Sequence, residues 1–319
     1  MATKLWIGGN AAGVSDWNVA ANWSPSGVPA SGDSVYITGP DSDNQDINAG
    51  LDQTATGPEG TEIVLANLTI LDNYLGHIGL AGTSYLQVSA TRCYLNVTSG
   101  VFGANGSPRC KIDFGANQTA CYVTGSCVST KDRGLEPIRL LGTHASNTLL
   151  VTGKATVGVA TTNNAEVSTF ASVTAGASGG LPTINLGEGC TLTTVAIGGG
   201  TIRNRGADVT TVSLSGGTYI SQGSAVHGTV NVRGGTVFYN SDGTLTTAVV
   251  GGGATLDFSR DARAKTVTNM SMSSGSMLNL DNGSPLSVTI TNGIDFVDCS
   301  PTDVQIRTGP NVNLTLSAI

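Results

Sequence analysis

Apolar residues in the middle of this chain recur in short alternating groups, each followed by glycine. The clearest groups are 195–200 (VAIGGG), 212–217 (VSLSGG), 230–235 (VNVRGG) and 248–253 (AVVGGG), so the pattern repeats at a nearly constant spacing. An apolar-x-apolar group is typical of a strand with one buried face, and glycine permits the positive φ of a tight turn. The pattern predicts one strand and one corner per coil of a β-solenoid.

The same spacing extends in both directions. Further groups begin at Ile78, Leu95, Ile112, Ile138, Val157, Val173, Met270, Val288 and Val304. One coil cannot bury its apolar face alone, whereas stacked coils bury a continuous core. We therefore expect an all-β, single-stranded β-solenoid (a parallel β-helix) of about 13 short coils. We expect right-handed winding, because apolar residues do not recur every six positions as in a left-handed hexapeptide solenoid.

Three of the six cysteines share the repeat spacing. Cys93, Cys110 and Cys127 are equally spaced, and the first two each lie just before the first apolar position of a group, at Leu95 and Ile112. This register predicts an interior ladder of reduced thiols, since free cysteine is usually buried. The chain has no C-x-x-C pair, so the sequence gives no support to a zinc ribbon or a thioredoxin-type site.

Two steps between groups are longer than most. They are the step from Ile112 to Ile138 and the step from Ala248 to Met270. We expect these steps to place loops around Arg133 and Arg260 outside the stack. Such loops are either partner surfaces or tolerated insertions, and the sequence leaves both open.

The N-terminal part of the chain differs from the repeats. It contains all three tryptophans, Trp6, Trp17 and Trp23. We expect an N-terminal cap or anchoring region over residues 1–66 and a β-solenoid over residues 67–319. Large aromatic side chains cover the open end of a stack in the first interpretation, and dock the rod on a larger assembly in the second.

Composition narrows the class of partner. Charged residues make up 12% of the chain and its net charge is -7, while 39% of residues are hydrophobic. Disordered chains combine low hydrophobicity with high net charge, so the chain should fold. The acidic balance argues against a nucleic-acid partner, which needs clustered Lys and Arg. No apolar run approaches the roughly 20 residues that span a bilayer, so we expect no membrane partner. The apolar stretch 5–7 is too short for a secretory signal, which favours a product of the cytoplasm or a trimmed chain.

The sequence offers no catalytic constellation, so we expect no enzyme, no cofactor and no metal. Glycosidases need two carboxylates that face one cleft, whereas the carboxylates in the repeats are scattered, and Asp242 and Asp281 lie in turn sequences. His77, His144 and His227 are solitary in the sequence.

One acidic stretch superficially resembles the start of a calcium loop. It comprises Asp41, Asp43, Asn44 and Asp46, but Asp46 occupies the position where such a loop requires glycine. We therefore interpret it as a solvated turn.

The Trp-rich run 6–37 and the later Gly-Gly-Thr corners carry a family resemblance. The chain resembles the β-solenoid virion proteins of tailed bacteriophages, which are capsid decoration (cement) proteins and tailspikes, and more weakly the passenger repeats of autotransporters. The resemblance implies a virion structural protein made in the host cytoplasm, forming a homotrimer and contacting the major capsid protein or another virion protein. The leading expectation is a decoration protein. The alternatives are a tailspike or tail fibre that binds or cleaves host polysaccharide, and a bacterial β-helix adhesin.

Overall fold

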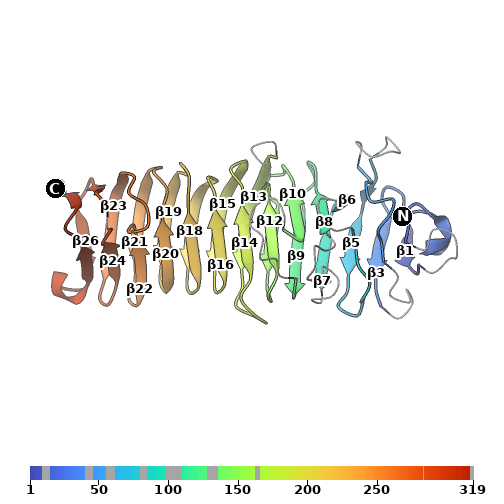
Figure 1. The fold of residues 1–319 in the computed structure, drawn as a ribbon, viewed down its shortest axis with the longest axis horizontal. Coiled ribbons are helices and arrows are strands. Elements are labelled where there is room, and N and C mark those ends of the chain that lie inside the picture. The colour runs from blue at the N-terminus through green and yellow to red at the C-terminus, as the bar shows by residue number, and fades with distance from the viewer. Residues whose placement is uncertain are drawn as a thin grey trace.

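The computed structural model describes residues 1–8, 15–39, 46–54, 62–79, 85–97, 109–127, 136–161, 166–282 and 284–316. Their strands lie across the long axis of a rod, and the two chain termini lie at its opposite ends (Figure 1). Among the named strand pairs of these residues, only β1 with β2 is antiparallel, and the others are parallel. The predicted all-β parallel solenoid is confirmed, whereas its right-handed winding stays a prediction.

The strands form two long sheets, which we call sheet 1 and sheet 2. Sheet 1 has 16 strands among the described residues. They are β1 (Thr3–Trp6), β2 (Trp23–Ser24), β3 (Ser34–Ile37), β5 (Asn67–Ile70), β7 (Cys93–Val97), β9 (Ala120–Gly125), β11 (Thr148–Val151), β13 (Ser168–Ala175), β15 (Cys190–Ile197), β17 (Asp208–Leu214), β19 (His227–Val232), β21 (Leu245–Val250), β23 (Lys265–Ser273), β25 (Leu286–Ile290), β26 (Ile294–Val297) and β28 (Val312–Leu316).

Sheet 2 has 12 strands in the same described ranges. They are β4 (Val64–Leu65), β6 (Tyr85–Ala90), β8 (Arg109–Asp113), β10 (Ile138–Leu141), β12 (Thr156–Val159), β14 (Thr183–Leu186), β16 (Thr201–Asn204), β18 (Thr218–Ser221), β20 (Gly235–Tyr239), β22 (Ala254–Asp257), β24 (Met277–Leu280) and β27 (Gln305–Thr308). Two short 3₁₀ helices complete the described elements, η1 (Ala20–Asn22) and η2 (Pro301–Asp303). No helix in the described part of the chain is long and apolar enough to cross a lipid bilayer.

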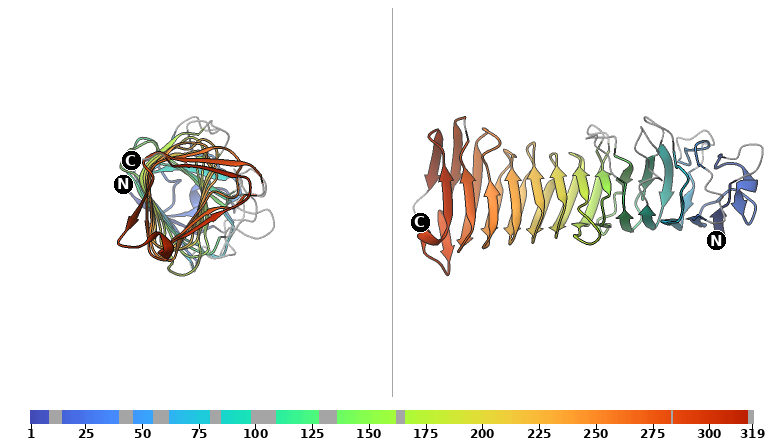
Figure 2. Two further views of the ribbon diagram at one scale, coloured as in Figure 1. Left: turned by 90° about the vertical axis from the view of Figure 1, so that its left-hand side faces the viewer. Right: turned by 60° about the horizontal axis from the view of Figure 1, so that its bottom comes forward.

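From β4 to β25 the chain alternates between the two sheets, so each of these coils contributes a strand to both (Figure 2). The prediction of one strand and one corner per coil was therefore wrong. The glycine corner joins the two strands of a coil, and its glycines stack. Gly200, Gly217 and Gly235 have φ near 79°, 76° and 78°. A Cβ on Gly217 would lie 2.6 Å from the carbonyl oxygen of Gly200, so the corner excludes larger residues.

The clearest predicted ladder is confirmed. Val195, Val212, Val230, Ala248 and Met270 occupy one register position in five successive strands of sheet 1. All five are buried in a single apolar cluster that includes residues from β1 to β25. In these strands of sheet 1 buried side chains largely alternate with exposed or half-buried ones, so stacked coils enclose a continuous core.

The predicted cysteine ladder was wrong, although its three thiols are reduced and buried. Cys93 in sheet 1 lies opposite Cys121 of the next coil, and Cys110 in sheet 2 lies opposite Leu86 and Ile138. Coils in this half of the rod are longer than the step from Cys93 to Cys110, so that step crosses from one sheet to the other. Burial raises the pKa of the Cys110 thiol to about 12, which keeps it protonated and unreactive.

The N-terminal segment continues the solenoid. β1 and β3 extend sheet 1 in parallel, and β3 pairs with β5. Trp6, Trp17 and Trp23 are buried in the same core, with the ring centroids of Trp6 and Trp17 at 5.0 and 4.7 Å from that of Trp23. The tryptophan side chains close the end of the core, so their contacts are made inside the protein. This arrangement favours the cap interpretation for these side chains.

Candidate binding face

The outward side chains of sheet 1 form a long flat surface, which we call the sheet 1 face. Strand alternation points every second residue outward, and the in-register pairing aligns these residues in columns along the rod. The first column is Thr148, Ser172, Thr194, Thr211, Thr229, Thr247 and Asn269. The second column is Tyr36, Thr69, Tyr94, Tyr122, Leu150, Thr174, Ala196, Ser213, Asn231, Val249 and Ser271.

Neither column contains a charged residue as far as β23, and beyond it the second column continues to Asp295 of β26, which is in register with Ser271. The second column also holds three of the exposed large apolar side chains, Tyr94, Tyr122 and Val249, with 39%, 47% and 37% of their surface accessible. Apolar side chains are stabilised by leaving water, hydroxyl and amide side chains can be buried where they find hydrogen-bond partners, and unpaired charges are costly to bury. The sheet 1 face is therefore suited to burial against another surface.

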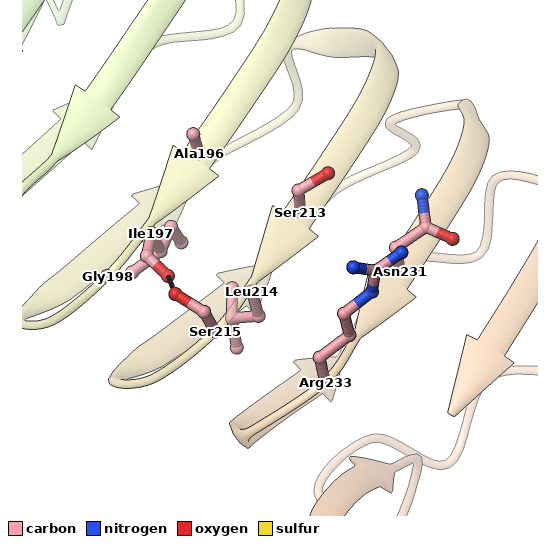
Figure 3. Close-up of a pocket in the computed structure, with 8 residues that line it drawn as sticks. All are labelled: Ala196, Ile197, Gly198, Ser213, Leu214, Ser215, Asn231 and Arg233. Carbon is pink, nitrogen blue, oxygen red and sulfur yellow. Dashed lines mark hydrogen bonds between the residues drawn. The ribbon is translucent and has the colours of Figure 1, made fainter. Parts of the chain in front are cut away.

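A groove of about 330 Å³ opens in this face across β15, β17 and β19 (Figure 3). It is lined by Ala196, Ile197, Gly198, Ser213, Leu214, Ser215, Asn231 and Arg233. The small side chains of the first two strands create the hollow, and the Ser215 hydroxyl donates to the Ile197 carbonyl at 3.4 Å. Arg233 and Asn231 stand together on the β19 side (Figure 3). The groove thus combines a small-residue floor with one guanidinium.

The two flanks of the sheet 1 face carry opposite charges. Arg233 follows β19, is exposed, and its guanidinium has no hydrogen-bond or ion-pair partner among the described residues. Asp208 begins β17 on the other flank. In β17 two successive residues, Thr210 and Thr211, are not buried, although the residues on either side, Val209 and Val212, point inward. This break in the alternation marks a bend in the strand. Asp208 is exposed and accepts one bond, from the backbone N–H of Val226 at 2.9 Å.

The outward surface of sheet 2 is different, because charged residues recur along it. One column contains Lys111, Arg139, Arg203, Asp257 and Arg307. Glu166 forms ion pairs with Arg139 and, at 3.3 Å, with Lys111. Lys111 and Arg139 are paired within the protein, and Arg307 is exposed to solvent. We therefore assign no partner to this surface.

The loop predicted around Arg260 does lie on the outside, and it is held by internal contacts. The Arg260 guanidinium covers the Phe238 ring at 3.3 Å. Arg263 donates to Asp261 at 2.8 Å and to Asp242 at 3.0 Å, and also to the Gly223 carbonyl at 3.1 Å. These bonds tie the loop to neighbouring coils. The loop predicted around Arg133 lies outside the described residues.

The histidines that the sequence leaves solitary have partners in the fold. His77 lies 3.0 Å from Asp46, and His144 accepts from the Ser146 backbone at 3.1 Å. Asp41, Asp43 and Asn44 of the acidic stretch lie outside the described residues. Among the described residues, no group of three or more His, Cys, Asp or Glu side chains could hold a metal ion.

His227 is the buried histidine, and it joins a polar network between coils. Its Nε2 accepts from the Tyr219 hydroxyl at 2.8 Å, and its Nδ1–H donates to the Ala225 carbonyl at 3.2 Å. The Tyr219 oxygen in turn accepts from Asn204 at 2.8 Å. Burial lowers the pKa of His227 to about 4, so the ring is neutral near pH 7. Sequence spacing could not predict this network, because Asn204, Tyr219 and His227 come from three different strands, β16, β18 and β19.

No family model matches the chain, and neither a curated protein nor a solved structure matches it.

Proposed function

We propose that this chain is a bacteriophage virion structural protein, a capsid decoration (cement) protein that works as a homotrimeric rod. The observation that carries the proposal is the uncharged sheet 1 face, which runs along the rod from Tyr36 to Ser271. The face carries no charge that would oppose burial, and its exposed Tyr94, Tyr122 and Val249 favour association with another surface. A rigid rod with one such face supports a role in assembly.

The virion part of the proposal rests on the resemblance of the Trp-rich segment, and of a solenoid rich in Gly and Thr, to phage β-solenoid proteins. The capsid, or another virion protein, is the proposed second partner. Because Trp6, Trp17 and Trp23 are buried, attachment at the N-terminal end would use other side chains of residues 1–66. Leu75, with 59% of its surface accessible, is the first exposed large apolar side chain after that region in the described part of the chain.

Location in the particle tests this proposal. We would label purified particles of the phage that encodes the chain with a gold-conjugated antibody against it and image them by electron microscopy. Label spread over the shell is the expected result. Label confined to the tail would replace the proposal by a tailspike or tail fibre, and unlabelled particles would exclude both.

A polysaccharide-binding tailspike is the second candidate, and one observation favours it. Tyr94 and Tyr122 are exposed in register on adjacent strands. Exposed aromatic rings are suited to pack against the apolar faces of sugar rings as well as against another protein. The same antibody label separates the two candidates.

A further inference from the structure

We propose that a second copy of this chain covers the sheet 1 face, and that Arg233 of one protomer pairs with Asp208 of its neighbour. The proposal rests on the homotrimer of the proposed function and identifies the surface that forms it. Four observations support it: the length of the face, its area, its lack of charge, and the opposite charges on its flanks.

Length favours a copy of the chain as the occupant. The sheet 1 face follows the stacked strands from β3 to β23 along the rod axis. A globular partner would cover a few coils of such a surface. A second rod aligned in parallel can contact the face along its whole length. Because both rods have the same rise per coil, equivalent residues of the two rods lie at the same height.

The area of the face is comparable with that of a specific protein interface. The strands from β3 to β23 in the sheet 1 order span ten inter-strand spacings. At about 4.8 Å per spacing and about five residues per strand, the face measures about 50 by 15 Å, or roughly 750 Å². A specific interface buries about 800 Å² on each partner. The face therefore has about the area of one specific contact, and in a trimer each rod divides this area between its two neighbours.

Rotational symmetry brings the two flanks together. When three parallel rods turn the same face toward a threefold axis, one flank of each rod meets the opposite flank of the next. Arg233 lies on the flank after β19, and Asp208 lies on the other flank in β17. β17 and β19 are adjacent in the stack, so the two groups differ in height by about one strand spacing, roughly 4.8 Å, which an arginine side chain can reach.

The pairing would also use groups that the single chain leaves available. Arg233 has no side-chain partner among the described residues, and the one bond that Asp208 accepts occupies a single carboxylate oxygen. Arginine and carboxylate form some of the strongest charge-assisted hydrogen bonds in proteins. Pairing at the edge of an uncharged face would set the rotation and height of one rod against the next.

Charge reversal tests the pair. We would measure the mass of wild type, Arg233→Asp, Asp208→Arg and the double variant by light scattering over a dilution series. Each single variant should raise the trimer dissociation constant at least tenfold, and the double variant should return it to near the wild-type value. Arg307→Asp makes the same change in charge at an exposed position of sheet 2, and it should leave the trimer dissociation constant unchanged.

A second pair of variants tests the face itself. The double variant Thr211→Lys with Thr229→Lys places charges within the sheet 1 face, and Thr218→Lys with Thr236→Lys places them at matched positions on sheet 2. The first pair should yield monomers and the second pair trimers, with circular dichroism confirming that all variants are folded.

The outcomes separate this proposal from the proposed function. A wild-type trimer that is indifferent to both the charge reversals and the sheet 1 lysines overturns the assignment of the face and leaves the virion role standing. Trimers disrupted by the sheet 1 lysines but not rescued by the double charge reversal overturn the Arg233–Asp208 pair. A wild-type monomer at all concentrations overturns the trimer on which both depend.

Discussion

Acid should destabilise this fold through one buried histidine. His227 is 0% exposed and neutral, held between the Tyr219 hydroxyl and the Ala225 carbonyl. Other titratable groups near it are Asp208, which raises its pKa, and the Tyr239 hydroxyl at 3.4 Å. Burial outweighs these effects and lowers the pKa of His227 from 6.5 to about 4.

The sign and size of the effect follow from proton linkage. Above pH 6.5 His227 is neutral in both states, so its contribution to stability is fully present. Between pH 6.5 and 4 the unfolded chain binds the proton and the folded chain does not, so stability falls. This difference in pKa corresponds to about 3 kcal/mol lost by pH 4. That loss is a large share of the total free energy of unfolding of a typical folded domain, which is only marginally stable.

The assay compares pH dependence between variants. We would measure denaturant unfolding at fixed protein concentration from pH 7 to pH 4 for wild type, His227→Gln and His77→Gln. His227→Gln should be less stable than wild type at pH 7, but its free energy of unfolding should fall by about 3 kcal/mol less on acidification. His77→Gln, at an exposed site, should keep the wild-type pH response.

Equal pH dependence in wild type and His227→Gln would refute this reasoning. It would mean that His227 titrates in the folded rod much as it does in the unfolded chain. The carboxyls of Asp33, Asp242 and Asp261, whose pKa values are lowered from 3.8, lose their contribution mainly below pH 4 and are common to both variants, so they do not affect the comparison.

Two further predictions concern the core and catalysis. Val212→Asp should unfold the rod, because it buries an unpaired charge between Val195 and Val230; loss of the β-sheet circular dichroism signal is the measurement, and a soluble folded variant would contradict the register. Purified protein incubated with host polysaccharide should release no reducing ends; turnover that disappears when two nearby carboxylates are replaced would make the tailspike the better proposal.

The sequence predicts the solenoid best where the coils are shortest. Val195, Val212 and Val230 are one coil apart because glycine corners keep those coils short and nearly equal in length. Toward the N-terminus the coils lengthen, and both sheets show the same apolar alternation. The number of residues between Cys93 and Cys110 therefore equals the length of a short coil, but the two cysteines lie in different sheets.

The candidate face could not be identified from the sequence in the same way. Thr211 and Thr218 both follow the local pattern of outward threonines, yet they belong to different sheets. Only the strand order shows that Tyr122 shares a column with Leu150, and that Arg233 and Asp208 lie on opposite flanks of one face. Lateral position around the rod depends on the bends, and these leave little trace in residue type.

The copy number of the chain in purified virions tests the proposed function most directly. Isotope-labelled peptides from this chain and from the major capsid protein would give their ratio by quantitative mass spectrometry. A decoration protein made of trimers predicts hundreds of copies per particle, in a fixed ratio to the capsid protein and in a multiple of three. A handful of copies, as for a tail component, or no copies at all would contradict it.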